Sequence, residues 1–264
     1  MNNSISLFDS GVGGLSVLRE IYNQLPCENI LYFADHMHIP YSIKPEKLIK
    51  KYVFEIINFL VGKKAKIIVI ACNVATSIAL KDAREKFNIP IVGVIEPGAK
   101  MAVKVTKNKV VGILGPKKVT EIYKQIIGSL DSTINLFGQP CSDFADFVEQ
   151  GLVNPKKIQE TANIYLKPLK EKRIDTLILG CTHYPFLKDF IRKVIEPKVK
   201  FVDPSRQTVL EVKEILKQSG NLNVWRQEES IHKFFVSGHK QNFKFVVEKL
   251  IGKKIDKVEQ NVLL

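Results

Sequence analysis

Two apolar runs that each end in a cysteine constrain the fold of this chain more than any other feature. The runs read KIIVIACNVATS from Lys66 and DTLILGCTHYPF from Asp175, so the two thiols belong to Cys72 and Cys181. A continuous apolar run of this length is typical of a parallel strand that is buried on both faces. Open α/β sheets place their chemistry at the carboxyl ends of such strands. Two thiols in this setting predict a pair of matched acid/base groups rather than a single nucleophile.

Glycine-rich transitions from strand to loop precede the two cysteines at nearly equal intervals. They read LFDSGVGG from Leu7 and GILGPKK from Gly112. Asp9 lies 63 residues before Cys72 (72 − 9), and Gly115 lies 66 residues before Cys181 (181 − 115). This regularity predicts an internal duplication. Two similar α/β domains related by a pseudo-twofold axis would then present their thiols to one cleft from opposite sides.

Strand-like runs alternate with amphipathic segments along the chain, which is the pattern of mostly parallel sheets covered by helices. We predict helices over 46–60, 119–130, 156–171 and 208–219. The turns EPG at 96–98 and DPS at 203–205 mark expected crossings between domains, so we predict a discontinuous first domain, 1–97 plus 206–264, and a second domain, 98–205. The predicted strands are 5–9, 29–35, 66–72, 90–96, 109–115, 132–137, 175–181, 199–203 and 232–238.

Composition indicates a globular protein with reduced thiols. The four cysteines form no CxxC pair, the N-terminus has no signal-peptide pattern, and no apolar stretch approaches the roughly 20 residues that span a bilayer. We therefore expect a cytoplasmic protein with no membrane partner. The net charge of +13 comes mostly from lysines on presumed helix faces, and such a field would attract an anionic substrate. Nucleic-acid binding is not expected, because no basic stripe is interleaved with aromatic residues.

Both thiols are expected near the N-terminus of a helix. Backbone N–H groups and the helix dipole stabilise a thiolate there and lower its pKa from about 8.5. Cys181 also has an imidazole nearby, that of His183. A single free cysteine is more often a packing residue, but the matched pair favours a functional role. Cys27 and Cys141 have no such neighbours and are expected to be structural.

Three shorter motifs allow further interpretations. DSGVGG lacks the glycine that GxGxxG requires at Ser16 and has no GK[ST], so a turn that exposes Asp9 and Ser10 is favoured over a phosphate loop. In that turn, Asp9 can accept a hydrogen bond from an ammonium group. His36 and His38 form an HxH pair, but the remaining histidines lack metal-ligand spacing, so no metal is expected. The turn Pro40-Tyr41-Ser42 suits either a contact with a ligand carboxylate or an ordinary structural role.

Together these segments resemble the cofactor-independent glutamate racemases of the aspartate/glutamate racemase family. The resemblance implies two α/β domains with the active site between them and no cofactor. In its two-base reaction, one cysteine thiolate removes the Cα proton of glutamate and the other thiol returns a proton to the opposite face. Cys72 would deprotonate D-glutamate and Cys181 L-glutamate. The segments span almost the whole chain: FDSGVGGLSVLREI, PYS, IVIACNVATSIAL, IPIVGVIEPGA, DTLILGCTHYPFL and FFVSGHKQNF.

The resemblance also implies a biological role and a set of substrate contacts. The role is the supply of D-glutamate for peptidoglycan synthesis, and because family members are often dimers, a homodimer is compatible with it. Glu149 matches an acidic residue near the second thiol. The positions for substrate contact and acid/base tuning are Asp9, Ser10, Tyr41, Ser42, Asn73, Val74, Thr182 and His183.

Three residues depart from the usual family pattern. Val74 replaces a threonine, Ser42 replaces a glycine and Pro116 replaces a threonine. Val74 and Pro116 remove polar donors near the expected pocket, which leaves two alternatives open. One is a racemase for aspartate, a hydantoin or a related compound. The other is a catalytically weak homologue that acts as a regulatory binding protein.

Overall fold

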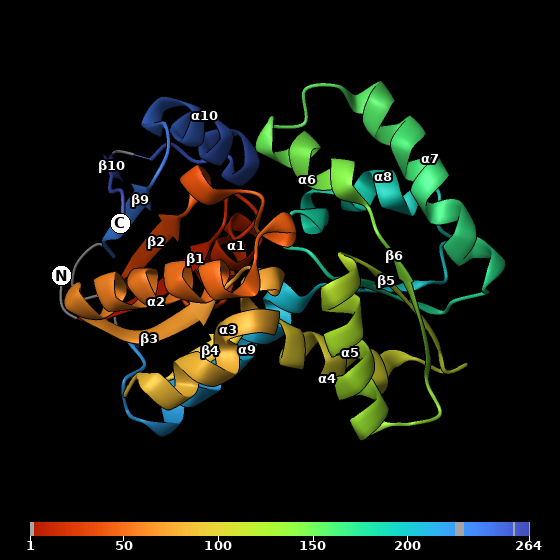
Figure 1. Cartoon of the computed structure of the whole chain (residues 1–264), viewed down its shortest axis with the longest axis horizontal. Coiled ribbons are helices and arrows are strands. Elements are labelled where there is room, and N and C mark those ends of the chain that lie inside the picture. The colour runs from red at the N-terminus through yellow and green to blue at the C-terminus, as the bar shows by residue number, and fades with distance from the viewer. Residues whose placement is uncertain (1–2, 225–229, 256, 264) are drawn as a thin grey trace.

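The computed structural model describes residues 3–224, 230–255 and 257–263 and contains two α/β domains, each built around its own sheet (Figure 1). The first sheet has the strand order β10-β9-β2-β1-β3-β4 and the second has the order β6-β5-β7-β8, and every described pairing is parallel. The strands are β1 (Ser4–Asp9), β2 (Ile30–Ala34), β3 (Ala65–Ile70), β4 (Ile91–Gly93), β5 (Val110–Leu114), β6 (Asn135–Gln139), β7 (Thr176–Leu179), β8 (Lys200–Val202), β9 (His232–Val236) and β10 (Val258–Gln260).

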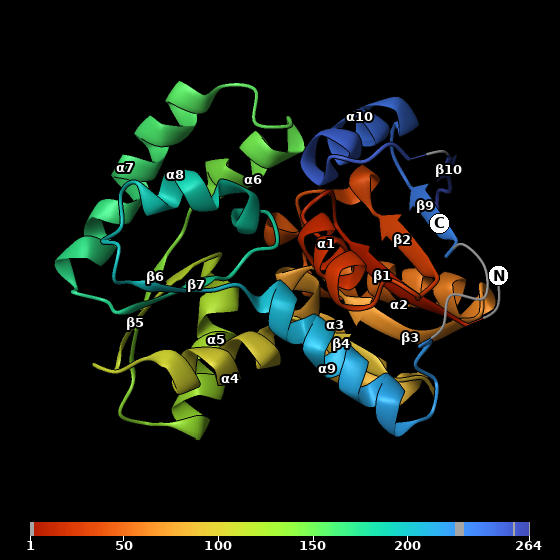
Figure 2. The same cartoon turned by 180° about the vertical axis from the view of Figure 1, so that it is seen from behind.

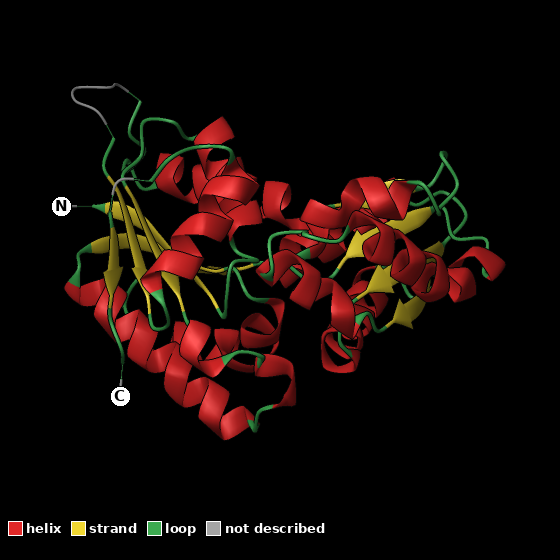
Figure 3. Cartoon of the chain, turned by 90° about the horizontal axis from the view of Figure 1, so that it is seen from above, coloured by secondary structure: helices red, strands yellow, loops and turns green. Residues whose placement is uncertain are grey.

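Helices follow most of the strands. In Figure 3 the two sheets occupy separate halves of the molecule, and helices lie between and around them. The α-helices are α1 (Leu15–Gln24), α2 (Glu46–Gly62), α3 (Asn73–Lys86), α4 (Ile95–Val105), α5 (Lys117–Leu130), α6 (Ser142–Glu149), α7 (Pro155–Glu171), α8 (Lys188–Arg192), α9 (Pro204–Gln218) and α10 (Lys240–Ile251). Three short 3₁₀ helices are η1 (His36–His38), η2 (Tyr41–Ile43) and η3 (Tyr184–Leu187).

The alternation of side chains along each strand determines which helices cover which face. In β1, Ile5 and Leu7 pack into the same core as α1, α9 and α10, whereas Phe8 joins the core beneath α2 and α3 (Figures 1 and 2). In the second domain, Ile178 of β7 packs with α4 and α5, and Leu177 packs with α7. Both sheets are therefore buried on two faces, which explains the continuous apolar runs in the sequence.

The two sheets repeat one topology. Within the first sheet, the strands β1 to β4 lie in the order β2-β1-β3-β4. The strands of the second sheet lie in the corresponding order, β6-β5-β7-β8. Cys72 follows the third strand of the first set and Cys181 follows the third strand of the second set. The predicted fold class, two similar α/β domains with mostly parallel sheets, is confirmed.

Most predicted elements are present, with small differences at their ends. All nine predicted strands and four predicted helices occur, whereas the short strand β10 was not predicted. The predicted domain limits fall within the first turns of α4 and α9, and these two helices pack against each other. Division at exactly these residues stays a prediction. Among the described residues, no helix combines the length and apolar character that crossing a membrane requires.

A buried ion pair lies at the edge of the first sheet where the strands β2 and β3 begin. Lys66 Nζ lies 2.6 Å from Glu28 Oε2, and the two side chains are 5% and 0% exposed. The backbone N–H of Asn223 donates to Glu28 Oε1 at 2.9 Å, which ties the segment after α9 to this edge. Loss of one partner would leave the other charge buried without compensation.

We predict that Lys66→Met lowers the free energy of unfolding by about 3–5 kcal/mol, because the buried Glu28 side chain then loses its ammonium partner. Chemical denaturation measures the change. Lys198→Met is the matched control: Lys198 pairs with Glu196 on the surface, where the side chains are 82% and 59% exposed, so the stability should barely change. Equal losses in the two variants would contradict the prediction.

Candidate active site

The two cysteines line one cavity between the domains. Cys72 directly precedes α3 and Cys181 lies between β7 and η3, so each thiol stands near the carboxyl end of its strand. The cavity has a volume of about 140 Å³. Nine of the ten residues predicted from the sequence line it: Ser10, Tyr41, Ser42, Cys72, Asn73, Val74, Cys181, Thr182 and His183. The tenth, Asp9, lies directly beneath it and is fully buried.

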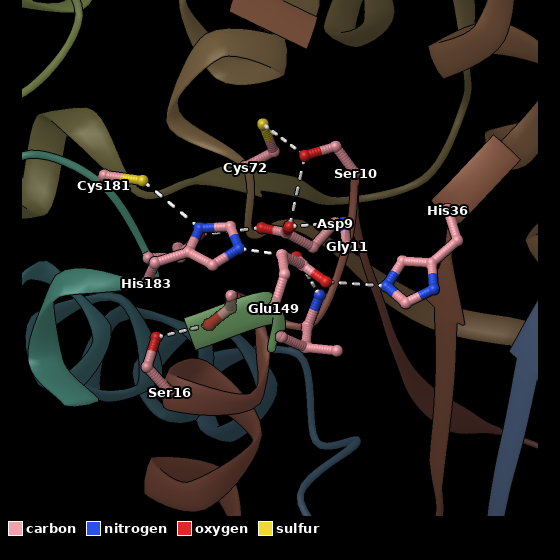
Figure 4. Close-up of polar contacts among 12 residues, drawn as sticks. Asp9, Ser10, Gly11, Ser16, His36, Cys72, Glu149, Cys181 and His183 are labelled. Atoms are coloured by element: carbon pink, nitrogen blue, oxygen red, sulfur yellow. Dashed lines mark hydrogen bonds and ion pairs between the residues drawn. The ribbon is translucent and has the colours of Figure 1, made fainter. Parts of the chain in front are cut away.

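The first thiol has a buried and mainly acidic environment. Cys72 Sγ lies 3.7 Å from Ser10 Oγ, and Ser10 Oγ lies 3.4 Å from Asp9 Oδ1 (Figure 4). Burial, and then the nearby Asp9 carboxylate, raise the pKa of Cys72 to about 12. The backbone N–H of Ala75, at the start of α3, acts in the opposite direction but is outweighed. The expectation of a lowered pKa at this helix start is therefore wrong for Cys72, because desolvation of the thiolate exceeds the effect of the helix.

Asp9 connects the two domains beneath the cavity. Its carboxylate accepts hydrogen bonds from the Gly11 backbone N–H at 2.9 Å and from Thr182 Oγ1 at 2.9 Å. Thr182 belongs to the second domain, next to Cys181. Burial raises the pKa of Asp9, although His183 and these donors oppose the rise. The group can therefore hold a proton more readily than an ordinary aspartate.

The second thiol has a basic partner instead. Cys181 Sγ lies 3.4 Å from His183 Nδ1, and His183 Nε2 lies 2.7 Å from Glu149 Oε1 (Figure 4). Glu149 Oε1 also accepts the backbone N–H of Val12 at 2.9 Å. Because the Glu149 carboxylate accepts a hydrogen bond from Nε2, the Nε2 atom of His183 carries a proton. The Nδ1 atom can therefore exchange a proton with Cys181.

The charges of this arrangement support one another. Burial disfavours the imidazolium, but the Cys181 sulfur and the Glu149 carboxylate together raise the pKa of His183 well above its ordinary value. Burial also disfavours the carboxylate, but hydrogen bonds from His183 and His36 hold the pKa of Glu149 well below its ordinary value. The pair is therefore an imidazolium and a carboxylate, held across the interface by Val12 of the first domain.

The glycines of DSGVGG make room for the second domain. A Cβ atom on Gly11 would overlap the carboxylate of Glu149, and a Cβ on Gly13 would lie 2.5 Å from Thr182 Oγ1. Such distances do not occur between real side chains, so only glycine allows this approach. The motif therefore brings the two domains into contact beside the thiols.

The turn residues and the histidine pair take separate partners. Tyr41 and Ser42 both line the cavity, and the Tyr41 hydroxyl donates to Asp35 Oδ2 at 2.6 Å. His38 Nδ1 lies 2.8 Å from Asp35 Oδ1, whereas His36 Nε2 lies 2.9 Å from Glu149 Oε2. The HxH pattern therefore does not direct both imidazoles toward one point.

Several residues at the site were not singled out in the sequence. Asp35 accepts hydrogen bonds from Tyr41 and, at 2.9 Å, from Ser237 Oγ, so it supports the turn that borders the cavity. Asp35 directly follows β2, and its position at the carboxyl end of a strand could have identified it. Other wall residues carry no comparable signal: Ile39, Ser142, Ala145, Asp146 and Tyr184. Pro116 also lines the wall, where it supplies no hydrogen-bond donor.

We predict that Gly11→Ala lowers the free energy of unfolding by about 1–3 kcal/mol, because the added methyl group displaces Glu149 from its site. Gly62→Ala is the control: Gly62 ends α2 and a Cβ there meets nothing within 4 Å, so the change should be neutral or slightly stabilising. Urea unfolding of both variants measures the difference. An unperturbed Gly11→Ala protein would rule out the close approach.

We predict that Glu149→Gln destabilises the protein in a pH-dependent way. The lowered pKa of Glu149 makes its contribution complete above its ordinary value of 4.5, and the contribution is lost as the pH falls through the native value. The raised pKa of His183 makes its contribution complete below 6.5, and that contribution is lost as the pH rises through the native value. The stability difference should therefore be largest between pH 4.5 and 6.5. Denaturation across a pH series measures it, and a constant difference would contradict the assignment.

Comparisons with known proteins agree with this geometry. The profile of the Asp/Glu/Hydantoin racemase family matches residues 13–212. The chain is 43% identical to a glutamate racemase of Exiguobacterium sibiricum, with 83% of this chain and 82% of that protein covered. It is 39% identical to a glutamate racemase of Geobacter metallireducens, where the shares are 97% and 96%.

Solved structures show the same similarity. A glutamate racemase isoform of Bacillus anthracis superposes with a TM-score of 0.92 at 34% identity and covers 98% of this chain and 97% of its own. The glutamate racemase of Francisella tularensis, solved in complex with D-glutamate, superposes with a TM-score of 0.90 at 31% identity and covers 99% and 98%. With two thiols facing one interdomain cavity and relatives matched over nearly the whole length, the chain belongs to the Asp/Glu/Hydantoin racemase family.

Proposed function

We propose that this protein is a glutamate racemase that interconverts L- and D-glutamate with two cysteines and no cofactor. One observation carries the proposal: two thiols at equivalent positions of a repeated topology line the same cavity, one from each domain. Inversion at a carbon atom by proton transfer requires one group on each face of that carbon. The glutamate racemases with which the chain shares about 40% identity support the choice of substrate.

In the direction from L-glutamate, Cys181 is the base. With the proton of Cys181 already held on His183 Nδ1, the thiolate removes the Cα proton, and the electron pair of the C–H bond passes into the substrate carboxylate. Cys72 then gives its proton to the opposite face of Cα and becomes a thiolate. The raised pKa of Cys72 suits this step, because a protonated thiol is available in the free protein.

In the direction from D-glutamate, Cys72 is the base and needs a site for its proton. The Ser10 hydroxyl lies between Cys72 and Asp9, and the Asp9 carboxylate has a raised pKa. Asp9 can therefore receive a proton through Ser10, which leaves the thiolate ready for Cα. Ser10 and Asp9 thus have the role at Cys72 that His183 and Glu149 have at Cys181.

The cavity offers neutral donors to the substrate carboxylates. Among the described residues that line it, none is lysine or arginine. The Ser42 hydroxyl and the first backbone N–H groups of α3 are the available donors, whereas the Ser10 and Thr182 hydroxyls already donate to Asp9. The side-chain oxygen of Asn73 is buried without a hydrogen-bond partner, so it is available to accept from the substrate ammonium group.

The remaining wall suits the aliphatic part of the substrate. Val74 and Pro116 provide apolar surface beside the thiols. In this proposal Val74 contacts the substrate with its methyl groups and its backbone N–H. The same proposal places the enzyme in the cytoplasm, where its product would supply D-glutamate for peptidoglycan synthesis, and it is compatible with a homodimer.

We predict that the protein exchanges the Cα proton of L- and of D-glutamate for deuterium in D₂O and racemises both. Cys72→Ser and Cys181→Ser should each lower kcat/KM by about 10²–10⁴-fold, because each removes one proton-transfer group. Proton NMR follows exchange, and optical rotation follows inversion. Cys27→Ser is the control, since Cys27 is half-buried and lies outside the cavity.

The outcomes separate the alternatives. Full activity in either active-site cysteine variant would refute the two-base mechanism. Faster turnover of aspartate than of glutamate would assign the protein to another substrate of the same reaction class. If neither amino acid exchanges its Cα proton, the racemase proposal is refuted, and the alternative of a regulatory binding protein is favoured.

A further inference from the structure

His36 extends the hydrogen-bonded chain of the second thiol into the first domain. It lies in η1, just beyond the end of β2, and its side chain is 16% exposed. Its Nε2 atom lies 2.9 Å from Glu149 Oε2, and in Figure 4 its ring approaches Glu149 from the side opposite His183. Nothing in the two-base reaction described above uses this residue.

The resulting chain has four members, Cys181, His183, Glu149 and His36. The contacts measure 3.4 Å from sulfur to His183, 2.7 Å from His183 to Glu149, and 2.9 Å from Glu149 to His36. Each imidazole meets a different oxygen of the same carboxylate. A change of charge on one imidazole must therefore alter the attraction of Glu149 for the proton of the other.

The packing around His36 holds its ring in place. Phe243 of α10 meets the ring edge-on, with 5.6 Å between ring centroids, and Gly238 leaves space for the His36 Cβ. Glu149 on α6 is the charged group that contacts the ring. The other titratable groups on neighbouring segments are Asp35 and His38, which pair with each other, and His239 and Lys240, which are exposed where α10 begins.

We propose that His36 is a positioning residue that controls, through Glu149, the proton shared by His183 and Cys181. When His36 is neutral, its Nε2–H orients Glu149 and the full negative charge of the carboxylate stabilises the His183 imidazolium. When His36 is protonated, its positive charge reduces that attraction, and the proton moves toward Cys181. This control rests on the proposed function, in which Cys181 alternates between thiolate and thiol.

The control reaches the second thiol through direct hydrogen bonds and the first thiol only through charge, because the charges of His183 and Glu149 act on Asp9. Cys72 is connected to Ser10 and Asp9, and neither of these accepts or donates a hydrogen bond to His36. Histidine is the side chain that ordinarily changes charge between pH 5 and 8. A change of charge on His36 would therefore act on the proton balance of the second thiol more directly than on that of the first.

The first test uses the protein without substrate. The ¹⁵N shifts of the His183 ring nitrogens are followed from pH 5 to 9 in the wild type, in His36→Gln and in His239→Gln. Glutamine keeps an N–H donor for Glu149 but cannot change charge. In the wild type, the His183 shifts should include a step that coincides with the titration of His36. That step should disappear in His36→Gln and persist in His239→Gln, whereas identical His183 curves in wild type and His36→Gln would overturn the proposal.

The second test is kinetic. The pH profile of kcat/KM for glutamate should lose the corresponding inflection in His36→Gln and keep it in His239→Gln. His36→Leu, which also removes the donor, should lower kcat/KM by about tenfold at neutral pH. A His36→Gln profile that superimposes on the wild type would overturn the proposal. If the wild type racemises no glutamate, the proposed function fails, and the ¹⁵N titration still decides whether His36 acts on His183.

Discussion

The contact between the glycine-rich loop and the second domain is the constraint on which the site depends. Asp9 accepts from Thr182, and Glu149 accepts from Val12, so each domain supplies a carboxylate to a donor of the other. Both side chains pack against glycines of the loop, Glu149 against Gly11 and Asp9 against Gly14. Each carboxylate is linked to one thiol through a single intervening residue, Asp9 to Cys72 through Ser10 and Glu149 to Cys181 through His183. The hydrogen bonds that join the domains therefore lie beside the two thiols that share the cavity.

A repeated topology has been given two different acid/base environments. Both cysteines follow the third strand of their set, but a long helix follows Cys72 and only a short 3₁₀ turn follows Cys181. Burial beside an acidic group makes Cys72 a thiol that keeps its proton, whereas Cys181 faces an imidazolium supported by a carboxylate. The symmetric backbone thus carries an asymmetric arrangement of charge, as a reaction with one acid and one base requires.

Sequence patterns predicted the architecture well because apolar strands and turn residues act locally. The cysteine-terminated runs identified β3 and β7, and the intervals before them identified the duplication. Patterns could not predict the depth at which Cys72 is buried, so the expected sign of its pKa shift was wrong. They also could not pair His36 with Glu149, since 113 residues separate the two and only the packing of α6 beside η1 brings them together. The short strand β10 carries charged and amide side chains, and no alternation marks it.

The discontinuity of the first sheet has a consequence for the order of assembly on the ribosome. The strands β5 to β8 are consecutive in the chain, so the second sheet can form as soon as Val202 has emerged. The first sheet is complete only after β9, which pairs with β2 and ends at Val236. The next residue, Ser237, donates to Asp35 behind the cavity wall. A nascent chain therefore carries the Cys181 half of the site before the wall opposite is complete. During synthesis from the N-terminus, the complete cavity with its two thiols would therefore form only after β9 has left the exit tunnel.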